Sequence, residues 1–323
     1  MPSRSEPGTS GPSAGAELPL LVFGGPYGNA QATAAVLAEA ARRGLPPHRV
    51  LCTGDLVAYC GEPAATIATI RAADIRRIAG NCDVGLASGA LDCGCGFAED
   101  SACDRLSAVW FAAARRDVGA ADRYWLATLP GRDVVAVGRR RLLVVHGGLE
   151  TINQFVFATT PLEEKRRQLA RAAVEGLDGI VGGHCGMPFT QVVDGRLWHN
   201  AGVAGMPAND GTPRVWYSVL TPRRGAVEIA HYALDYDHGA AQAAMARHGY
   251  PEAYRAALGS GLWPSCDVLP AFERSVQGRA LTPATVVWRA DGHRPGLGPH
   301  WPPWPVPATQ GEAAETTAAG PCC

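Results

Sequence analysis

The stretch that decides the fold is Leu142-Leu143-Val144-Val145-His146-Gly147-Gly148. Four large aliphatic residues in succession indicate a buried strand, and this strand ends in a histidine beside two glycines. The pattern recurs at Gly179-Ile180-Val181-Gly182-Gly183-His184. We therefore expect two buried strands, each of which presents an imidazole at its carboxyl end.

Two earlier stretches have the same design but end in oxygen donors. Val50-Leu51-Cys52-Thr53-Gly54-Asp55 ends in a carboxylate, and Ile75-Arg76-Arg77-Ile78-Ala79-Gly80-Asn81 ends in an amide. Functional sites in parallel sheets lie beyond the carboxyl ends of the strands. The sequence thus predicts that one carboxylate, one amide and two imidazoles lie close together.

The first part of the chain alternates strands and helices. We expect strands at 18–23, 49–53 and 75–79, separated by helices at 30–43 and 62–72, which indicates a parallel sheet covered by helices. A glycine-rich loop over 84–100 should follow. Next we expect helices at 101–116 and 121–129, strands at 133–137 and 141–146, a helix at 161–175 and a strand at 179–182.

The second half of the chain is predicted to form mainly antiparallel strands. Asp194-Gly195 is a strong hairpin signal between two short strands, 191–193 and 197–199. Strands at 214–220 and 226–232 are expected to complete a second, antiparallel sheet. The predicted fold class is α/β: a four-layer αββα sandwich of two packed mixed sheets flanked by helices.

Composition limits the classes of function. The chain has 323 residues, of which 47% are hydrophobic and 18% charged, which suits one large globular domain with appendages. A net charge of -1 gives no general attraction to nucleic acid or to an acidic membrane. We see neither a secretory signal nor a stretch of the roughly 20 apolar residues that span a membrane. We therefore expect a cytoplasmic protein. The sequence carries no signal for its oligomeric state.

The expected organisation has four parts. Residues 1–17 are a Ser/Gly/Pro-rich disordered tail, and residues 18–236 form the main domain. Residues 237–290 are expected to form a small, mainly helical appendage, with helices at about 237–248 and 250–258. A proline-rich tail at 291–323 ends in Cys322-Cys323.

The order of motifs resembles a known superfamily. The motifs are Gly54-Asp55, Gly80-Asn81-Cys82-Asp83, Val145-His146-Gly147, Gly183-His184-Cys185-Gly186 and Asn200-Ala201-Gly202-Val203. In this order they resemble the calcineurin-like metallophosphoesterases, most closely the small bacterial and archaeal phosphodiesterase branch. The resemblance covers about residues 18–232.

The resemblance implies two metal sites, of which this chain keeps one. Ligands of the second metal correspond to Asp55, Asn81, His146 and His184, and all four are present. At the first metal, only the bridging Asp55 remains, since the other three positions hold Gly25, Tyr27 and Gly186. We expect a single divalent ion bound by two nitrogens and two oxygens, a set that suits Mn²⁺, Fe²⁺ or Zn²⁺.

The function implied by the resemblance is metal-dependent hydrolysis of a small phosphomonoester or phosphodiester. The candidate catalytic residues are Asp55, Asp83, Cys82 and Tyr27, although Tyr27 is equally well explained as a packed aromatic residue. The alternative is a catalytically silent or redirected member that binds a metal for sensing, delivery or thiol chemistry.

Ten cysteines are too few for a disulfide scaffold in a chain of this length, so thiols or metal ligands are expected. Cys93, Cys95 and Cys103 admit two readings: a soft-metal or redox group, or small residues in a glycine-rich turn. The Cys322-Cys323 pair has two interpretations: it captures a thiophilic metal, or it belongs to an untethered tail.

Overall fold

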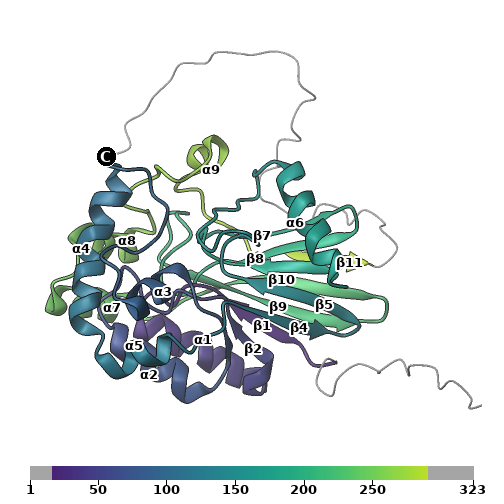
Figure 1. The fold of residues 1–323 in the computed structure, drawn as a ribbon, viewed down its shortest axis with the longest axis horizontal. Helices are drawn as coiled ribbons and strands as arrows, with labels where there is room; N and C mark the ends of the chain where they lie inside the picture. The colour runs from purple at the N-terminus through teal and green to yellow at the C-terminus, as the bar shows by residue number, and fades with distance from the viewer. Residues whose placement is uncertain (1–16, 290–323) are drawn as a thin grey trace, which may run out of the picture.

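The computed structural model describes residues 17–289, which form two β-sheets packed face to face between helices (Figure 1). The first sheet has the strand order β11-β10-β9-β1-β2-β3. Its strands are β1 (Leu20–Phe23), β2 (Val50–Cys52), β3 (Arg76–Arg77), β9 (Val215–Arg223), β10 (Ala226–Leu234) and β11 (Thr285–Arg289). Strands β1, β2 and β3 are parallel, as the alternating strand and helix pattern predicted.

The second sheet has the strand order β4-β5-β6-β8-β7. Its strands are β4 (Arg132–Val137), β5 (Arg140–Val145), β6 (Gly179–Gly182), β7 (Pro188–Val193) and β8 (Arg196–Ala201). Strand β6 lies parallel to both β5 and β8, whereas the β4–β5 and β7–β8 pairs are antiparallel hairpins. Both sheets are therefore mixed, as expected.

One prediction about sheet membership is wrong. The sequence pattern places strands 214–220 and 226–232 in the second sheet, but β9 pairs antiparallel with β1, with Leu20 opposite Leu220. The hairpin of β9 and β10 thus extends the first sheet. The periodicity of the local sequence identifies a hairpin, but it does not show which strand of which sheet the hairpin pairs with.

Three apolar layers hold the sandwich together. Between the sheets, side chains such as Val22, Val144 and Ile229 form a fully buried core. On the outer face of the first sheet lie α1 (Ala30–Arg42), α2 (Pro63–Ala73), α4 (Ala102–Asp117), α5 (Ala120–Leu126), α7 (His238–His248) and α8 (Glu252–Ser260). The outer face of the second sheet is covered by α6 (Leu162–Val174). This is the predicted αββα arrangement.

The segment predicted as a loop over 84–100 begins instead as a helix. Helix α3 spans Asn81–Ser88 and ends at Gly89, whose φ of 74° terminates it. Gly85 is accommodated because its missing side chain leaves room for Phe111 of α4, which would lie 3.3 Å from a Cβ atom there. Only the second part of the segment, after Gly89, lacks regular structure up to α4.

The segment after residue 237 makes close contact with the main domain. Met245 of α7 and Leu258 of α8 are fully buried in the core beneath the first sheet, and β11 pairs with β10. A short helix, α9 (Ala271–Ser275), and β11 were not anticipated. The predicted tails at 1–17 and 291–323, with Cys322 and Cys323, lie outside the described residues except for Glu17. Among the described helices, none is long and apolar enough to cross a membrane.

Candidate metal centre

Four side chains predicted to form a site lie together at the ends of four strands. Asp55 follows β2, Asn81 is the first residue of α3 after β3, His146 follows β5 and His184 follows β6. His146 Nε2 is 3.2 Å from Asp55 Oδ2, 3.1 Å from Asn81 Oδ1 and 3.2 Å from His184 Nδ1. Donor atoms of Asp55, His146 and His184 all lie within 4.8 Å of one another.

The hydrogen bonds of His146 and Asn81 indicate which of their side-chain atoms carry hydrogen and which present a lone pair. His146 Nδ1 is 2.7 Å from the Thr53 carbonyl oxygen, which only accepts, so the ring carries its proton on Nδ1. Asn81 Nδ2 donates to the Cys93 carbonyl oxygen at 2.9 Å, which points Asn81 Oδ1 towards His146. With His146 neutral, Nε2 therefore presents a lone pair to the oxygens of Asp55 and Asn81.

Glycines allow the strand ends to approach this closely. A Cβ atom on Gly80 would overlap the carboxylate of Asp55. A Cβ atom on Gly54 would lie 2.8 Å from His146 Nδ1, and the φ of this residue, 99°, is one that favours glycine. Each glycine beside a site residue is thus required by packing.

The electrostatics of the site follow from burial and from mutual contact. Burial disfavours ionisation of Asp55, but the neighbouring His146 imidazole holds the pKa of that carboxyl below its usual value. Burial likewise disfavours protonated His146, but the contact with Asp55 outweighs burial, so the pKa of His146 lies above its usual value. Burial and the adjacent His146 lower the pKa of His184 to about 3, so His184 is neutral. Among residues 17–289, His184 Nε2 is also buried without a hydrogen-bond partner.

Two of the predicted catalytic residues contact the backbone of the site. Asp83 is fully buried, and its two oxygens accept from the N–H groups of Leu56 and Gly80, both at 2.9 Å. The backbone N–H of Cys82 donates to Asp55 Oδ1 at 3.0 Å, and burial raises the pKa of the Cys82 thiol. Asp83 therefore joins the two strand-end loops that carry Asp55 and Asn81.

The positions of the missing ligands are filled by aromatic rings. A Cβ atom on Gly25 would overlap the ring of Tyr27, which has folded back over it. A Cβ atom on Gly186 would lie 3.0 Å from the indole of Trp263. Burial and the nearby Asp55 raise the pKa of Tyr27, so its phenol stays protonated. Tyr27 is thus packed and also lies close to the charged part of the site.

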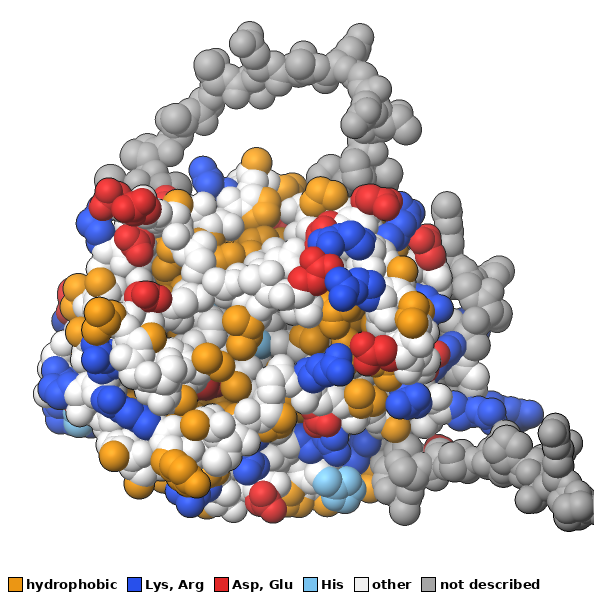
Figure 2. All heavy atoms as spheres, in the orientation of Figure 1, with side chains coloured by type: hydrophobic (Ala, Val, Ile, Leu, Met, Phe, Trp, Pro, Cys, Tyr) orange, Lys and Arg blue, Asp and Glu red, His pale blue; other side chains and the backbone are white. Residues whose placement is uncertain are grey.

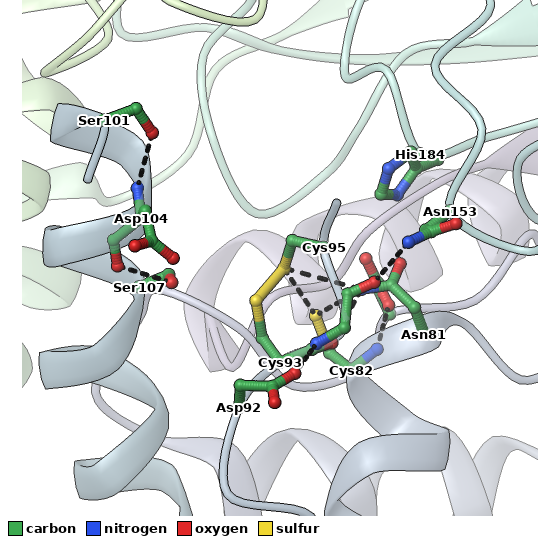
Figure 3. The surroundings of a disulfide bond; sticks show 12 residues. Asn81, Cys82, Asp92, Cys93, Cys95, Ser101, Asp104, Ser107, Asn153 and His184 are labelled. Atoms are coloured by element: carbon green, nitrogen blue, oxygen red, sulfur yellow. Dashed lines mark hydrogen bonds between the residues drawn. A yellow bond between two sulfur atoms is a disulfide. The ribbon is translucent and has the colours of Figure 1, made fainter. Parts of the chain in front are cut away.

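A disulfide lies directly against this site (Figure 3). Cys93 and Cys95 are bonded, and Cys82 Sγ lies 3.8 Å from Cys95 Sγ. Asn81 contacts both the Cys93 carbonyl and, at 3.4 Å, Cys95 Sγ. The expectation that these two residues would be thiols or metal ligands is therefore wrong. Cys103 of α4 is a free thiol, and it lines the pocket that adjoins His184.

A small pocket of about 60 Å³, partly open to solvent, adjoins His184. Its lining includes Tyr27 and Cys185, which sequence motifs pointed to, but also Tyr59, Phe155, Tyr254 and Trp263, which they did not. These aromatic residues come from segments outside the motifs, and each is typical of a packed core side chain. No local signal in the sequence connects them with a site.

Comparisons with known proteins agree with this architecture. The profile of the calcineurin-like phosphoesterase superfamily domain matches residues 28–223, more than half of the chain. Among solved structures, a metallophosphoesterase from Sphaerobacter thermophilus is similar over 76% of this chain and 99% of its own, with 21% identity and a TM-score of 0.58. The hypothetical protein PH1004 from Pyrococcus horikoshii OT3 has 16% identity over the same shares and a TM-score of 0.63. A search of curated proteins found no match.

Proposed function

Since this chain belongs to the calcineurin-like phosphoesterase superfamily, we propose that it hydrolyses a small phosphoester with the help of one divalent metal ion. The proposed ligand atoms are Asp55 Oδ2, Asn81 Oδ1, His146 Nε2 and His184 Nδ1. Two imidazole nitrogens and two oxygens suit Mn²⁺, Fe²⁺ or Zn²⁺ better than Mg²⁺, which prefers oxygen.

One observation carries this proposal. Asp55 Oδ2, Asn81 Oδ1 and His184 Nδ1 each lie 3.1–3.2 Å from His146 Nε2 in a buried space. When both imidazoles are neutral and carry their protons on the other ring nitrogen, all four atoms offer lone pairs, and the donor atoms of Asp55, His146 and His184 lie within 4.8 Å of one another. The donor set therefore fits a metal ion.

The residues around the proposed ion would have different roles. When bound, the metal supplies a Lewis acid that polarises a phosphoryl oxygen. Asp55 orients His146 and balances charge, while Thr53 and Cys93 hold the two neighbouring ligands through their carbonyl oxygens. The Tyr27 phenol keeps its proton and is suited to donate a hydrogen bond to a substrate oxygen.

Metal analysis combined with turnover tests the proposal. Protein loaded with Mn²⁺, Fe²⁺ or Zn²⁺ is expected to retain close to one equivalent after desalting and to hydrolyse bis(p-nitrophenyl) phosphate. His146→Ala should lose both the metal and the turnover, and Asp55→Asn should lose turnover. His48→Ala, at an exposed position, is the matched control. Zero or two bound equivalents in the unsubstituted protein would refute the single-metal centre.

The disulfide favours a second candidate, in which the centre binds a metal for thiol or redox chemistry. Cys95 Sγ lies 3.8 Å from Cys82 Sγ and 3.4 Å from Asn81 Nδ2, so a change in the disulfide would act directly on a proposed ligand. Tight metal binding without turnover of any phosphoester, together with metal affinity that changes on reduction, would select this candidate.

A further inference from the structure

The pocket beside His184 has an unusual chemical character for a site that would receive a phosphate. Among the described residues that line it there is no lysine, arginine, aspartate or glutamate. His184 is itself a proposed metal ligand, and an imidazole binds a metal only in its neutral form. The polar groups that remain are phenols, thiols and one serine hydroxyl, at Ser265.

Aromatic rings form most of the pocket wall and hold one another in place. The ring of Phe155 lies against His184, with centroids 4.2 Å apart. Tyr59 contacts Tyr27 and Tyr254, each with a centroid separation of 4.8 Å. Trp263 is held by a hydrogen bond from its Nε1 to the Pro207 carbonyl oxygen, at 2.7 Å.

The distribution of side chains on the surface is consistent with an apolar opening. Figure 2 shows hydrophobic side chains in the upper middle of the face drawn there, with acidic and basic side chains to either side. The same part of Figure 1 lies between α4 and α6. Phe155 and Trp263 are both partly exposed, so the wall that they form is accessible.

We propose that this pocket binds an apolar or aromatic organic group of a singly charged phosphodiester, so that the protein selects such diesters over doubly charged monoesters. This inference rests on the proposed function, because His184 belongs both to the proposed metal ligands and to the pocket wall. A bound monoester would bring two negative charges next to a wall without cations, so that a single metal ion would have to offset their lost hydration. A diester carries one charge, and its apolar substituent gains by leaving water.

A matched set of substrates isolates the pocket from the chemistry. All three compounds release p-nitrophenol: p-nitrophenyl phenylphosphonate and p-nitrophenyl methylphosphonate carry one charge, and p-nitrophenyl phosphate carries two. With Mn²⁺ bound, kcat/KM for the phenyl compound is expected to exceed that for the methyl compound by at least about tenfold. Turnover of all three at similar kcat/KM would overturn the inference and leave the proposed function standing.

A pair of charge substitutions tests the location. Ser265 is partly exposed on the pocket wall, away from the proposed ligands. Ser265→Lys should raise kcat/KM for the doubly charged p-nitrophenyl phosphate relative to the singly charged phosphonate esters, and Ser265→Asp should lower it. Ser275→Lys on α9 places the same charge on an exposed surface and should leave the ratio unchanged. If Ser265→Lys and Ser275→Lys act alike, the pocket does not set the preference.

A binding measurement keeps the inference testable without turnover. Diphenyl phosphate, added to the metal-loaded protein, is expected to quench tryptophan fluorescence through Trp263, whereas inorganic phosphate at the same concentration should not. Trp263→Phe should remove this signal while calorimetry still detects binding. If diphenyl phosphate binds but no ester is hydrolysed, the proposed function fails and the pocket assignment holds. If diphenyl phosphate does not bind, the pocket assignment fails.

Discussion

The indole of Trp263 lies against Gly186, so that a Cβ atom at residue 186 would be 3.0 Å from the ring, a closer contact than Cβ atoms normally make. The ring of Tyr27 covers Gly25 in the same manner. In the resemblance to metallophosphoesterases, residues 25 and 186 correspond to ligands of the first metal. The two aromatic rings therefore crowd two of the three positions at which the resemblance implies lost ligands of the first metal, and restoring one ligand by substitution should not restore a second metal.

Gly186→His is the first prediction. The φ of Gly186 is 76°, which costs a non-glycine residue about 1–2 kcal/mol, and overpacking against Trp263 adds about 1–3 kcal/mol. Urea unfolding should show this loss of stability, and metal analysis should still find one equivalent.

The control for this change is Gly225→His in the β9–β10 turn. Gly225 has the same φ of 76°, but no atom lies within 4 Å of a Cβ atom built there. The difference between the two variants thus measures the packing against Trp263. Equal losses of stability, or a second bound metal in Gly186→His, would contradict the structural interpretation.

The second prediction concerns Asp83. Both of its oxygens accept from backbone N–H groups, whereas an asparagine amide offers one acceptor and turns its NH₂ group towards the other N–H. We expect Asp83→Asn to lower the free energy of unfolding by about 1–3 kcal/mol, the cost of a buried donor left without an acceptor. Asp92→Asn is the matched control, since exposed Asp92 accepts one bond, from Gly94, that asparagine can keep. Equal effects of the two changes would mean that Asp83 does not hold the loops.

The four proposed ligands could be found from the sequence because each follows a short apolar run at a glycine. Those runs are local features, and parallel pairing brings the carboxyl ends of β2 and β3 to one edge of the first sheet and those of β5 and β6 to one edge of the second. The packing of the two sheets then brings the two pairs of residues together. Asp55, Asn81, His146 and His184 therefore converge as predicted.

What the sequence did not reveal depends on contacts between distant segments. Trp263 and Gly186 are 77 residues apart, and nothing near either residue predicts their contact. The edge to which β9 adds is likewise set by the packing of the whole sandwich. For Cys93 and Cys95, the spacing was visible, but the bond depends on the path of the chain after α3.

The third prediction concerns the disulfide. Iodoacetamide applied to denatured, unreduced protein should leave Cys93 and Cys95 unmodified, because those sulfurs are bonded, while the free thiols Cys82 and Cys103 on the same tryptic peptide should be alkylated. Cys52 and Cys60 in the same sample are thiols and should be alkylated completely. After reduction, Cys93 and Cys95 should be alkylated too, as peptide mass spectrometry would show. Full alkylation of Cys93 and Cys95 before reduction would rule out the bond.

A pair of buried histidines bridges the two sheets away from the metal centre. Thr190 Oγ1 of β7 lies 2.8 Å from His199 Nδ1 and 2.7 Å from His231 Nε2 of β10. Ser218 Oγ of β9 lies 2.9 Å from His231 Nδ1. Within the described part of the chain, the side-chain partners of the two rings are hydroxyl groups, which carry no negative charge to stabilise a protonated ring, and His199 Nε2 has no partner.

The fourth prediction follows from His231, whose pKa is lowered by burial from 6.5 to about 4. Between these values the unfolded chain binds the proton and the folded chain does not, so stability is complete above about pH 6.5 and falls as the pH drops towards 4. The contribution of His231 is on the order of 3 kcal/mol. Urea unfolding at pH 7, 5.5 and 4.5 should show that His231→Gln, which keeps a hydrogen-bonding side chain without this titration, loses less stability on acidification than the unsubstituted protein. His48→Gln, at an exposed position, should follow the unsubstituted protein. An unchanged pH dependence in His231→Gln would mean that His231 does not carry this acid sensitivity, because the substitution removes only one titrating group from the network.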